Sequence, residues 1–241
     1  MHTGRSPEAA DRGEAAPRWL LALDTSTEQA GIALSDGERT SVRSWDAGRA
    51  QTTTVLPAVD ALMRESGVGM DALAAVAVAI GPGTFTGLRV GLSIAKGFVL
   101  ARDLALVGGQ TLEVAAAAAG ADEAEVVAVL PAGRGRVVWQ RFAGGRAEEP
   151  RNTTVPELVA ALAVWPEALV IGELAESQRA DVEAAHPHVR WEARDPAVLA
   201  RIGWERWRAG DVDDPVRLEP IYLHGATVQA PPVQDRLRRR R

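Results

Sequence analysis

The sequence predicts an α/β protein of two lobes, and three observations carry this prediction. Short apolar stretches at 20–23 and 30–34 are followed closely by an alternating stretch at 40–45, as in an antiparallel meander of three strands. Apolar residues then recur at helical spacing until Gly67. Two further units follow, each with an apolar strand, a glycine turn and a helix. The first half of the chain therefore has the order β-β-β-α-β-α-β-α.

Turn and cap residues mark the ends of these elements. Asp36-Gly37 lies between the second and third strands and is a strong hairpin signal. The first helix is expected from about Thr52 to Arg64. Ala75 to Ile80 is apolar throughout, as a parallel strand buried on both faces must be, and Gly81-Pro82-Gly83 bounds it. A helix from about Thr84 to Ala101 is expected to follow.

The same order is characteristic of the ribonuclease H-like lobes of actin, Hsp70 and sugar kinases. Leu106-Val107, Gly108-Gly109 and a helix from Thr111 to Ala119 complete it. A smaller second lobe is expected to start near Asp122. Within it, Thr154-Val155-Pro156 predicts the start of a helix that runs to Leu162.

Four parts of the chain are expected. Residues 1–18 are polar and aperiodic, which predicts a disordered extension. The first lobe is expected at 19–121 and the second at 122–225. Residues 226–241 end in several Arg and predict a disordered basic tail.

Composition limits the classes of function. Of the 241 residues, 46% are hydrophobic, which can supply a core. Cys is absent, which excludes disulfides, thiolate nucleophiles and Cys-ligated zinc, and the four His do not have the spacing of a metal site. A formal net charge of −5 disfavours a body that binds nucleic acid by itself. No apolar run suits a membrane span or a signal peptide, so we expect a soluble, cytoplasmic protein with no membrane partner.

A candidate site for weak nucleotide binding follows the first strand. It consists of Asp24, Thr25, Ser26 and Thr27. In two-lobed actin-like folds a nucleotide phosphate sits here, where amides and hydroxyls donate to phosphate oxygens and a carboxylate serves the metal. The alternative is that these side chains only satisfy a turn. Spacing leaves both interpretations open.

The glycine run before the second long helix is a candidate packing or dimer face. It lacks the Lys-Ser or Lys-Thr of a Walker motif. Small residues recur every four positions, which allows another helix to approach closely; they are Gly83, Gly87, Gly91 and Ala95. The alternative is a helix contact within the chain. No catalytic residue and no metal ligand are predicted, because the sequence has neither a nucleophile elbow nor a metal-site spacing.

Several motifs, taken in order, resemble the TsaB family, also called glycoprotease-like. They are Leu21-Ala22-Leu23-Asp24-Thr25-Ser26-Thr27, Gly81 to Gly91, Gly109-Gln110-Thr111-Leu112 and Pro220-Ile221-Tyr222-Leu223. The resemblance is strong over about 19–119. It implies an actin-like fold and a non-catalytic dimerisation subunit that needs no cofactor. The implied partners are a TsaD-like catalytic subunit, a TsaE-like ATPase or a second copy, with tRNA bound only through the complex. That complex transfers a threonylcarbamoyl group to the adenosine beside the anticodon.

Mapped onto this chain, the resemblance places the interface on the first two long helices. The expected interface residues are Leu56, Val59, Met63, Gly83, Gly87, Leu88, Gly91, Leu92 and Ala95. Two departures from the family argue against residual catalysis. Ala50 stands where many members keep a His, and Pro131 stands where the family has an Asp-Ala-Arg-like turn. The competing hypotheses are an autonomous small ATPase or kinase that uses Asp24 to Thr27, and a metallopeptidase, which lacks every ligand.

Overall fold

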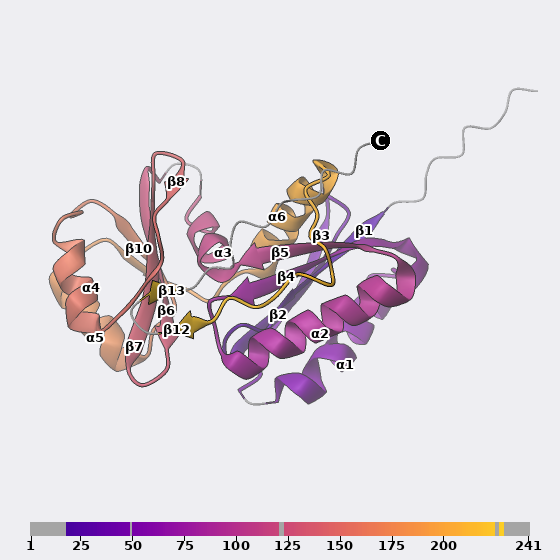
Figure 1. The fold of residues 1–241 in the computed structure, drawn as a ribbon, viewed down its shortest axis with the longest axis horizontal. Helices are drawn as coiled ribbons and strands as arrows, with labels where there is room; N and C mark the ends of the chain where they lie inside the picture. The colour runs from indigo at the N-terminus through magenta and orange to yellow at the C-terminus, as the bar shows by residue number, and fades with distance from the viewer. Residues whose placement is uncertain (1–17, 49, 121–122, 225–226, 229–241) are drawn as a thin grey trace, which may run out of the picture.

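The protein, seen here as a computed structural model that describes residues 18–48, 50–120, 123–224 and 227–228, contains two sheets side by side (Figure 1). The first sheet has the order β3-β2-β1-β4-β5. Its strands are β1 (Trp19–Asp24), β2 (Gln29–Ser35), β3 (Thr40–Asp46), β4 (Leu73–Gly81) and β5 (Ala105–Gln110). The first three are antiparallel, whereas β4 runs parallel to both β1 and β5. The predicted meander and the predicted buried parallel strand are therefore confirmed.

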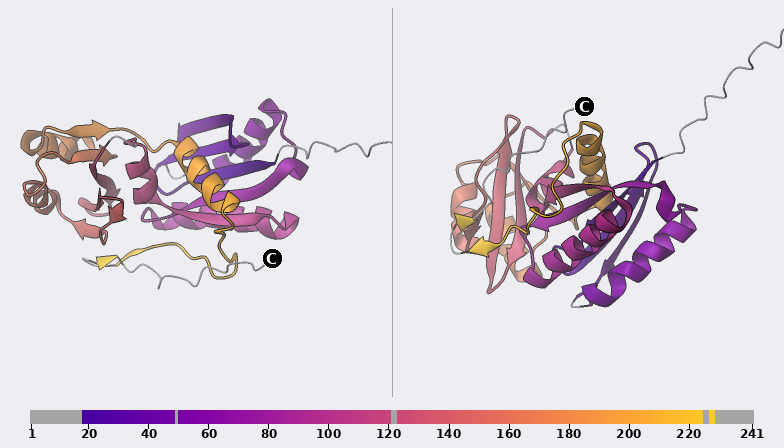
Figure 2. Two further views of the ribbon diagram at one scale, coloured as in Figure 1. Left: turned by 90° about the horizontal axis from the view of Figure 1, so that it is seen from above. Right: turned by 45° about the vertical axis from the view of Figure 1, so that its right-hand side comes forward.

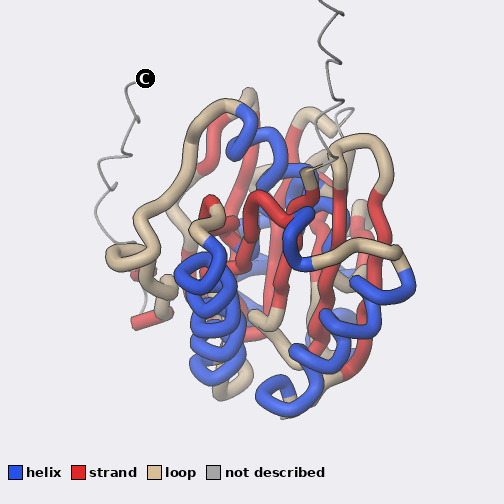
Figure 3. The backbone as a smooth tube through the Cα atoms, turned by 90° about the vertical axis from the view of Figure 1, so that its right-hand side faces the viewer, coloured by secondary structure: helices blue, strands red, loops and turns tan. Residues whose placement is uncertain are grey.

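Three helices alternate with these strands as predicted. They are α1 (Gln51–Glu65), α2 (Phe85–Arg102) and α3 (Thr111–Ala117), with a short 3-10 helix, η1 (Met70–Ala72), before β4. Helices α1 and α2 lie together on one face of the first sheet, as Figures 1 and 3 show. Thr84 caps α2, because its side chain accepts a hydrogen bond from the Gly87 amide.

The composition of β4 explains why helices cover both faces of the first sheet. Val76, Val78 and Ile80 belong to the core shared with α1 and α2. Alanines at the alternate positions face the other side, where they pack with Leu199, Ala200 and Ile202 of α6 (Pro196–Arg208). A Cβ on Gly203 of α6 would lie 2.5 Å from the Cβ of Ala77. Small residues on both elements therefore let α6 approach the sheet closely.

The second sheet has the order β11-β10-β6-β7-β9-β13-β12, with β8 beside β7. Its strands are β6 (Glu125–Ala132), β7 (Arg136–Ala143), β8 (Arg146–Ala147), β9 (Arg151–Thr153), β10 (Leu169–Gly172), β11 (Val189–Trp191), β12 (Leu223–His224) and β13 (Thr227–Val228). Helices α4 (Val155–Leu162) and α5 (Glu176–Ala185) pack on its outer face, and Leu158 and Val182 are fully buried there. Alternate strand residues such as Ala128 and Ile171 join the core that contains Leu112 of α3. Helix α3 therefore connects the two sheets through apolar contacts.

The chain crosses between the lobes more than once. After the second sheet it returns, through α6, to the first sheet, and the C-terminal segment then runs back toward β12 (Figure 2). The division at 19–121 and 122–225 stays a prediction, with α6 of the second range lying on the first sheet. The predicted extension and tail lie outside the described residues, except that Arg18 is described and 227–228 form β13.

Candidate functional site

The turn after β1 is organised by the carboxylate of Asp24. Its Oδ1 atom accepts hydrogen bonds from the Ser26 amide at 2.9 Å and from the Ser26 hydroxyl at 2.6 Å. The Thr27 carbonyl accepts a hydrogen bond from Gln51 Nε2 at 3.2 Å. All four residues from Asp24 to Thr27 are buried. The loop is thus a closed, internally bonded turn rather than a row of free donors.

Helix α2 begins directly against this turn. The Thr84 amide donates to the Ser26 carbonyl at 2.6 Å, and the Thr25 hydroxyl donates to the Gly87 carbonyl at 2.7 Å. A Cβ on Gly87 would lie 2.0 Å from the Thr25 carbonyl oxygen, and one on Gly91 would lie 2.4 Å from the Thr25 hydroxyl. A side chain at either position would therefore displace the turn or the helix.

The stripe of small residues is consequently used inside the chain. A Cβ on Gly83 would meet the Ser26 carbonyl at 2.3 Å, and Ala95 is fully buried. Among the nine expected interface residues, Leu56 alone is exposed. Gly83 is half-buried, and the other seven are buried: Val59, Met63, Gly87, Leu88, Gly91, Leu92 and Ala95. The small residues therefore contact the chain's own Asp24 turn rather than another helix of the chain. Their assignment to an interface with a partner stays a prediction.

Arg194 joins this turn to the second lobe and was not among the residues predicted from the sequence. Arg194 lies between β11 and α6, and its Nε donates to Asp24 Oδ2 at 2.8 Å. One terminal nitrogen pairs with Glu173, and the other donates to the Thr27 hydroxyl at 3.1 Å. The Thr27 hydroxyl in turn donates to Glu173 Oε2 at 3.2 Å. We call Asp24, Thr27, Glu173 and Arg194 the interlobe cluster.

The interlobe cluster is nearly dry. Exposed fractions of the side chains are 2% for Arg194, 4% for Asp24 and 13% for Glu173. Burial alone would raise the pKa of Asp24, but the charge of Arg194 and the hydrogen bonds from Arg194 and Ser26 outweigh it, so this pKa lies below its ordinary value. Burial likewise opposes the charge of Arg194, and the two carboxylates outweigh it, so its pKa is raised. Asp24 and Arg194 therefore stay ionised at neutral pH.

A nucleotide with its metal does not fit this arrangement. Both Asp24 oxygens already accept hydrogen bonds, one from Ser26 and one from Arg194. The guanidinium of Arg194 fills the space between Asp24 and Glu173, and the cluster carries two carboxylates against one guanidinium. A triphosphate would meet a net negative charge in a place from which water is already excluded. The prediction of at most weak nucleotide binding at Asp24, Thr25, Ser26 and Thr27 thus gains a physical reason.

Glu173 could have been found from sequence, whereas Arg194 could not. Glu173 follows an apolar strand, as Asp24 follows the first strand, and carboxylates at strand ends are candidates for a shared site. Arg194 is one of many arginines in a loop. No local pattern distinguishes it, because its partners are 21 and 170 residues away in the chain.

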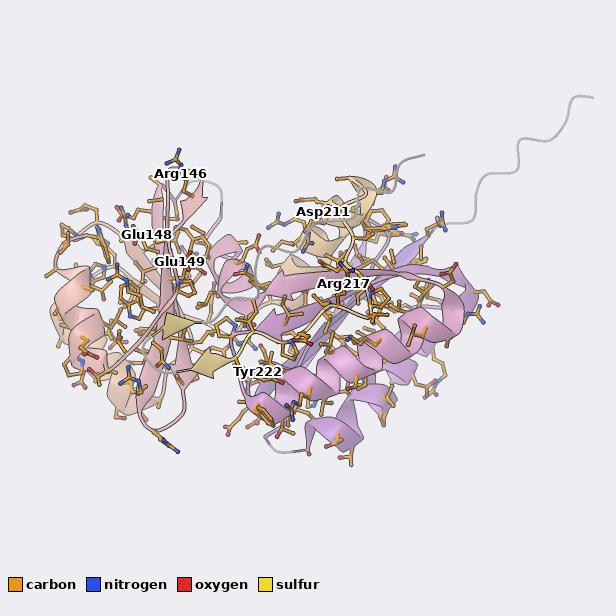
Figure 4. All side chains as sticks on the ribbon, in the orientation of Figure 1. Arg146, Glu148, Glu149, Asp211, Arg217 and Tyr222 are labelled. Carbon is orange, nitrogen blue, oxygen red and sulfur yellow. The ribbon has the colours of Figure 1, made fainter. Side chains whose placement is uncertain are left out.

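Helices α1 and α2 carry large apolar side chains that are exposed. They are Leu56, 49% exposed, Phe85, 56% exposed, and Leu100, 71% exposed. Between them on α2, Gly97 is exposed, and a Cβ there would have no atom within 4 Å. The Phe85 ring packs at a tilt against Tyr222, which Figure 4 labels. Arg89 lies over the Phe85 ring, and its Nε donates to the Tyr222 hydroxyl at 2.8 Å. We call Leu56, Phe85, Ser93, Gly97 and Leu100 the outer helix face.

Other kinds of site find less support in the described part of the chain. There, no group of three His, Cys, Asp or Glu side chains could hold a metal ion. No helix among the described residues is long and apolar enough to cross a membrane.

Comparison with known proteins gives consistent similarities. A family model described as TsaD, tRNA N6-adenosine threonylcarbamoyltransferase, matches residues 45–195. The tRNA threonylcarbamoyladenosine biosynthesis protein TsaB of Haemophilus influenzae is 43% identical over 101 residues, or 42% of each chain. TsaB of Escherichia coli is 33% identical over 147 residues, which cover 58% of this chain and 64% of that protein. An uncharacterised protein of Mycobacterium tuberculosis is 32% identical over 213 residues, which cover 85% of this chain and 90% of that one.

A solved structure titled YeaZ from Pseudomonas aeruginosa has the same fold. It superimposes with a TM-score of 0.68 at 24% identity, and the match covers 86% of this chain and 100% of that chain. Fold and site together thus define an actin-like, two-lobed α/β protein. Its Asp24 turn binds the guanidinium of Arg194 from the same chain. The match spans 42% and 64% of the lengths of the two TsaB proteins above. The chain belongs to the TsaB family.

Proposed function

We propose that this chain is a non-catalytic dimerisation subunit in the biosynthesis of tRNA threonylcarbamoyladenosine. It binds a TsaD-like catalytic subunit and, with it, a TsaE-like ATPase, and it meets tRNA only through that complex. The names of the TsaB relatives support a role in the biosynthesis of tRNA threonylcarbamoyladenosine. The outer helix face is the observation that carries the scaffold role.

This face has the properties of a helix-packing interface. Ser93, Gly97 and Leu100 follow the i, i+4, i+7 spacing that places residues on one side of a helix. Small residues at 93 and 97 allow a partner helix to approach, and the apolar side chains Phe85 and Leu100 at either end of α2 supply anchors. Leu56 extends the surface onto α1. A glycine in the middle of a helix is unfavourable by roughly 1 kcal/mol relative to alanine. Nothing within the chain packs against Gly97, whereas the close approach of a partner helix would require a small residue there.

Gly97→Leu tests this proposal at an exposed position of α2, where an added Cβ would have no atom within 4 Å. The wild type and the variant are each mixed with a purified TsaD-like protein of the same organism, and the one-to-one complex is measured by size-exclusion chromatography with light scattering. We expect the wild type to form the complex and Gly97→Leu to bind at least tenfold more weakly, with a melting temperature no lower than that of the wild type, because leucine is also a better helix former than glycine. Gly97→Ala is the matched control, and it should retain binding.

Two results would refute the scaffold proposal. One is a wild type that does not bind the TsaD-like protein, and the other is a Gly97→Leu variant that binds as the wild type does. Light scattering of the chain alone separates the homodimer from the heterodimer, since both would use the same face. Gly87→Leu is unsuitable for this test, because a side chain there collides with the Thr25 carbonyl. The autonomous ATPase alternative finds no favourable observation in the interlobe cluster.

A further inference from the structure

The interlobe cluster lies where the two lobes meet and draws its charges from both. Asp24 ends β1 of the first sheet, whereas Glu173 directly follows β10 of the second. Arg194 lies on the connection that leaves β11 and enters α6, and so returns from the second sheet to the first. Each of its two carboxylate partners therefore belongs to a different lobe.

The bonding of Arg194 is complete in a way that fixes its position. Its Nε donates to Asp24 Oδ2 at 2.8 Å, and its own backbone amide donates to Glu173 Oε1 at 3.0 Å. The remaining guanidinium nitrogens contact Glu173 and the Thr27 hydroxyl, and one of them also reaches the Gln29 carbonyl at 3.4 Å. A buried guanidinium with this many acceptors is held in one position, because any movement would leave buried donors and carboxylates without partners.

We infer that Arg194 is a built-in replacement for the nucleotide and cation of actin-like folds, and that it holds the two lobes in one closed arrangement without any ligand. The positive guanidinium stands between two carboxylates as a bound cation would. The hydrogen bonds from Ser26 and Thr27 that could serve a phosphate are directed at Asp24 and Glu173. Binding of a nucleotide is therefore not needed to close the cleft.

The alternative to a fixed arrangement is a hinge. The lobes are also joined by the apolar contacts of α3, where Leu112 and Ala115 share a core with Val126 and Ile171. That contact lies on a single helix and can act as a pivot. If Arg194 supplies the second point of attachment, its removal leaves Asp24 and Glu173 to repel each other across the cleft, and the lobes should then separate around α3.

The test measures the distance between the lobes directly. Because the chain has no Cys, the exposed positions Asp60 on α1 and Asp181 on α5 can be changed to Cys and spin-labelled without background. Pulsed electron paramagnetic resonance then gives the distribution of label distances. We expect one narrow distribution in the otherwise wild-type chain, unchanged by 2 mM MgATP. Arg194→Met should broaden it at least twofold, and Arg194→Lys, which keeps the charge but loses the planar fork, should give an intermediate width.

Three outcomes would overturn the inference. The first is a shift of the wild-type distance distribution when MgATP is added. The second is a folded Arg194→Met chain whose distribution is as narrow as that of the wild type. The third is a distribution in Arg194→Lys that is as broad as the one in Arg194→Met. If Arg194→Met does not fold, Glu173→Gln replaces it, because this change removes one charge from the less buried end and keeps the Asp24 pair. A distance distribution of wild-type width in Glu173→Gln would then reject the inference that Arg194 holds the two lobes together. No partner protein is present, so this result does not depend on the proposed scaffold function.

Discussion

Replacing Gly87 by Ala should destabilise the protein, whereas the same change at Gly97 should stabilise it. Both glycines lie in α2, but a Cβ at 87 would be 2.0 Å from the Thr25 carbonyl oxygen and one at 97 would have no neighbour within 4 Å. Ordinary contact begins at 3.4 Å, so α2 or the Asp24 turn must move by more than 1 Å. The hydrogen bond from the Thr25 hydroxyl to the Gly87 carbonyl would be lost in the process.

The size of the effect follows from these contacts. Overpacking of this kind costs about 1–3 kcal/mol, and the lost hydrogen bond adds about 1 kcal/mol. The gain in helix propensity offsets part of this, so we expect Gly87→Ala to lower the free energy of unfolding by about 1–3 kcal/mol. Gly97→Ala should raise it by about 0.5–1 kcal/mol, because alanine is the better helix former and no contact changes.

Urea denaturation followed by circular dichroism gives both free energies of unfolding under the same conditions. In a chain of this length the Gly87→Ala change corresponds to a fall in melting temperature of roughly 2–12 °C. Equal stability of the two variants would refute the reasoning, because it would mean that α2 does not approach the turn as closely as the structure has it.

Two further predictions concern Asp24 and Thr154. Since the pKa of Asp24 is lowered from 3.8 in the folded chain, its charge stabilises the fold above about pH 4, and this contribution is lost as the pH falls through the folded-state pKa. Asp24→Asn should therefore lower the free energy of unfolding by about 3–5 kcal/mol at pH 7, with the difference from wild type shrinking below pH 3.8; a constant difference from pH 7 to pH 2.5 in urea titrations would contradict this. Thr154→Ala removes the capping box that Thr154 forms with Glu157 at the start of α4 and should cost about 1 kcal/mol, whereas Thr154→Ser, measured alongside, should stay close to wild type.

The first lobe follows from local sequence rules. The predicted order of strands and helices is confirmed, because each boundary has its own chemical signal. Asp36-Gly37 forms the turn between β2 and β3, with Gly37 at a φ of 93°. In the second lobe, Thr154-Val155-Pro156 predicts α4 with its correct bounds. Such signals act over a few residues, so they can be recognised without knowledge of the remaining chain.

Short strands of the second sheet were not predicted. β8, β9 and β11 have two or three residues each, and their pairing depends on neighbours elsewhere in the sheet rather than on their own pattern. The same limit applies to α6. Its apolar face is visible in the sequence, but its contact with the first sheet depends on the alanines of β4, more than a hundred residues earlier.

The sequence by itself therefore determined the fold class, the order of the elements in the first lobe and the family, because these depend on short motifs and on hydrophobic periodicity. Tertiary structure alone decided which side of α2 is buried and what the Asp24 turn binds. Small residues recur on both sides of that helix, and only the approach of the turn distinguishes Gly87 from Gly97. Likewise, any of many arginines could neutralise Asp24, and only the fold brings Arg194 to it across 170 residues of chain.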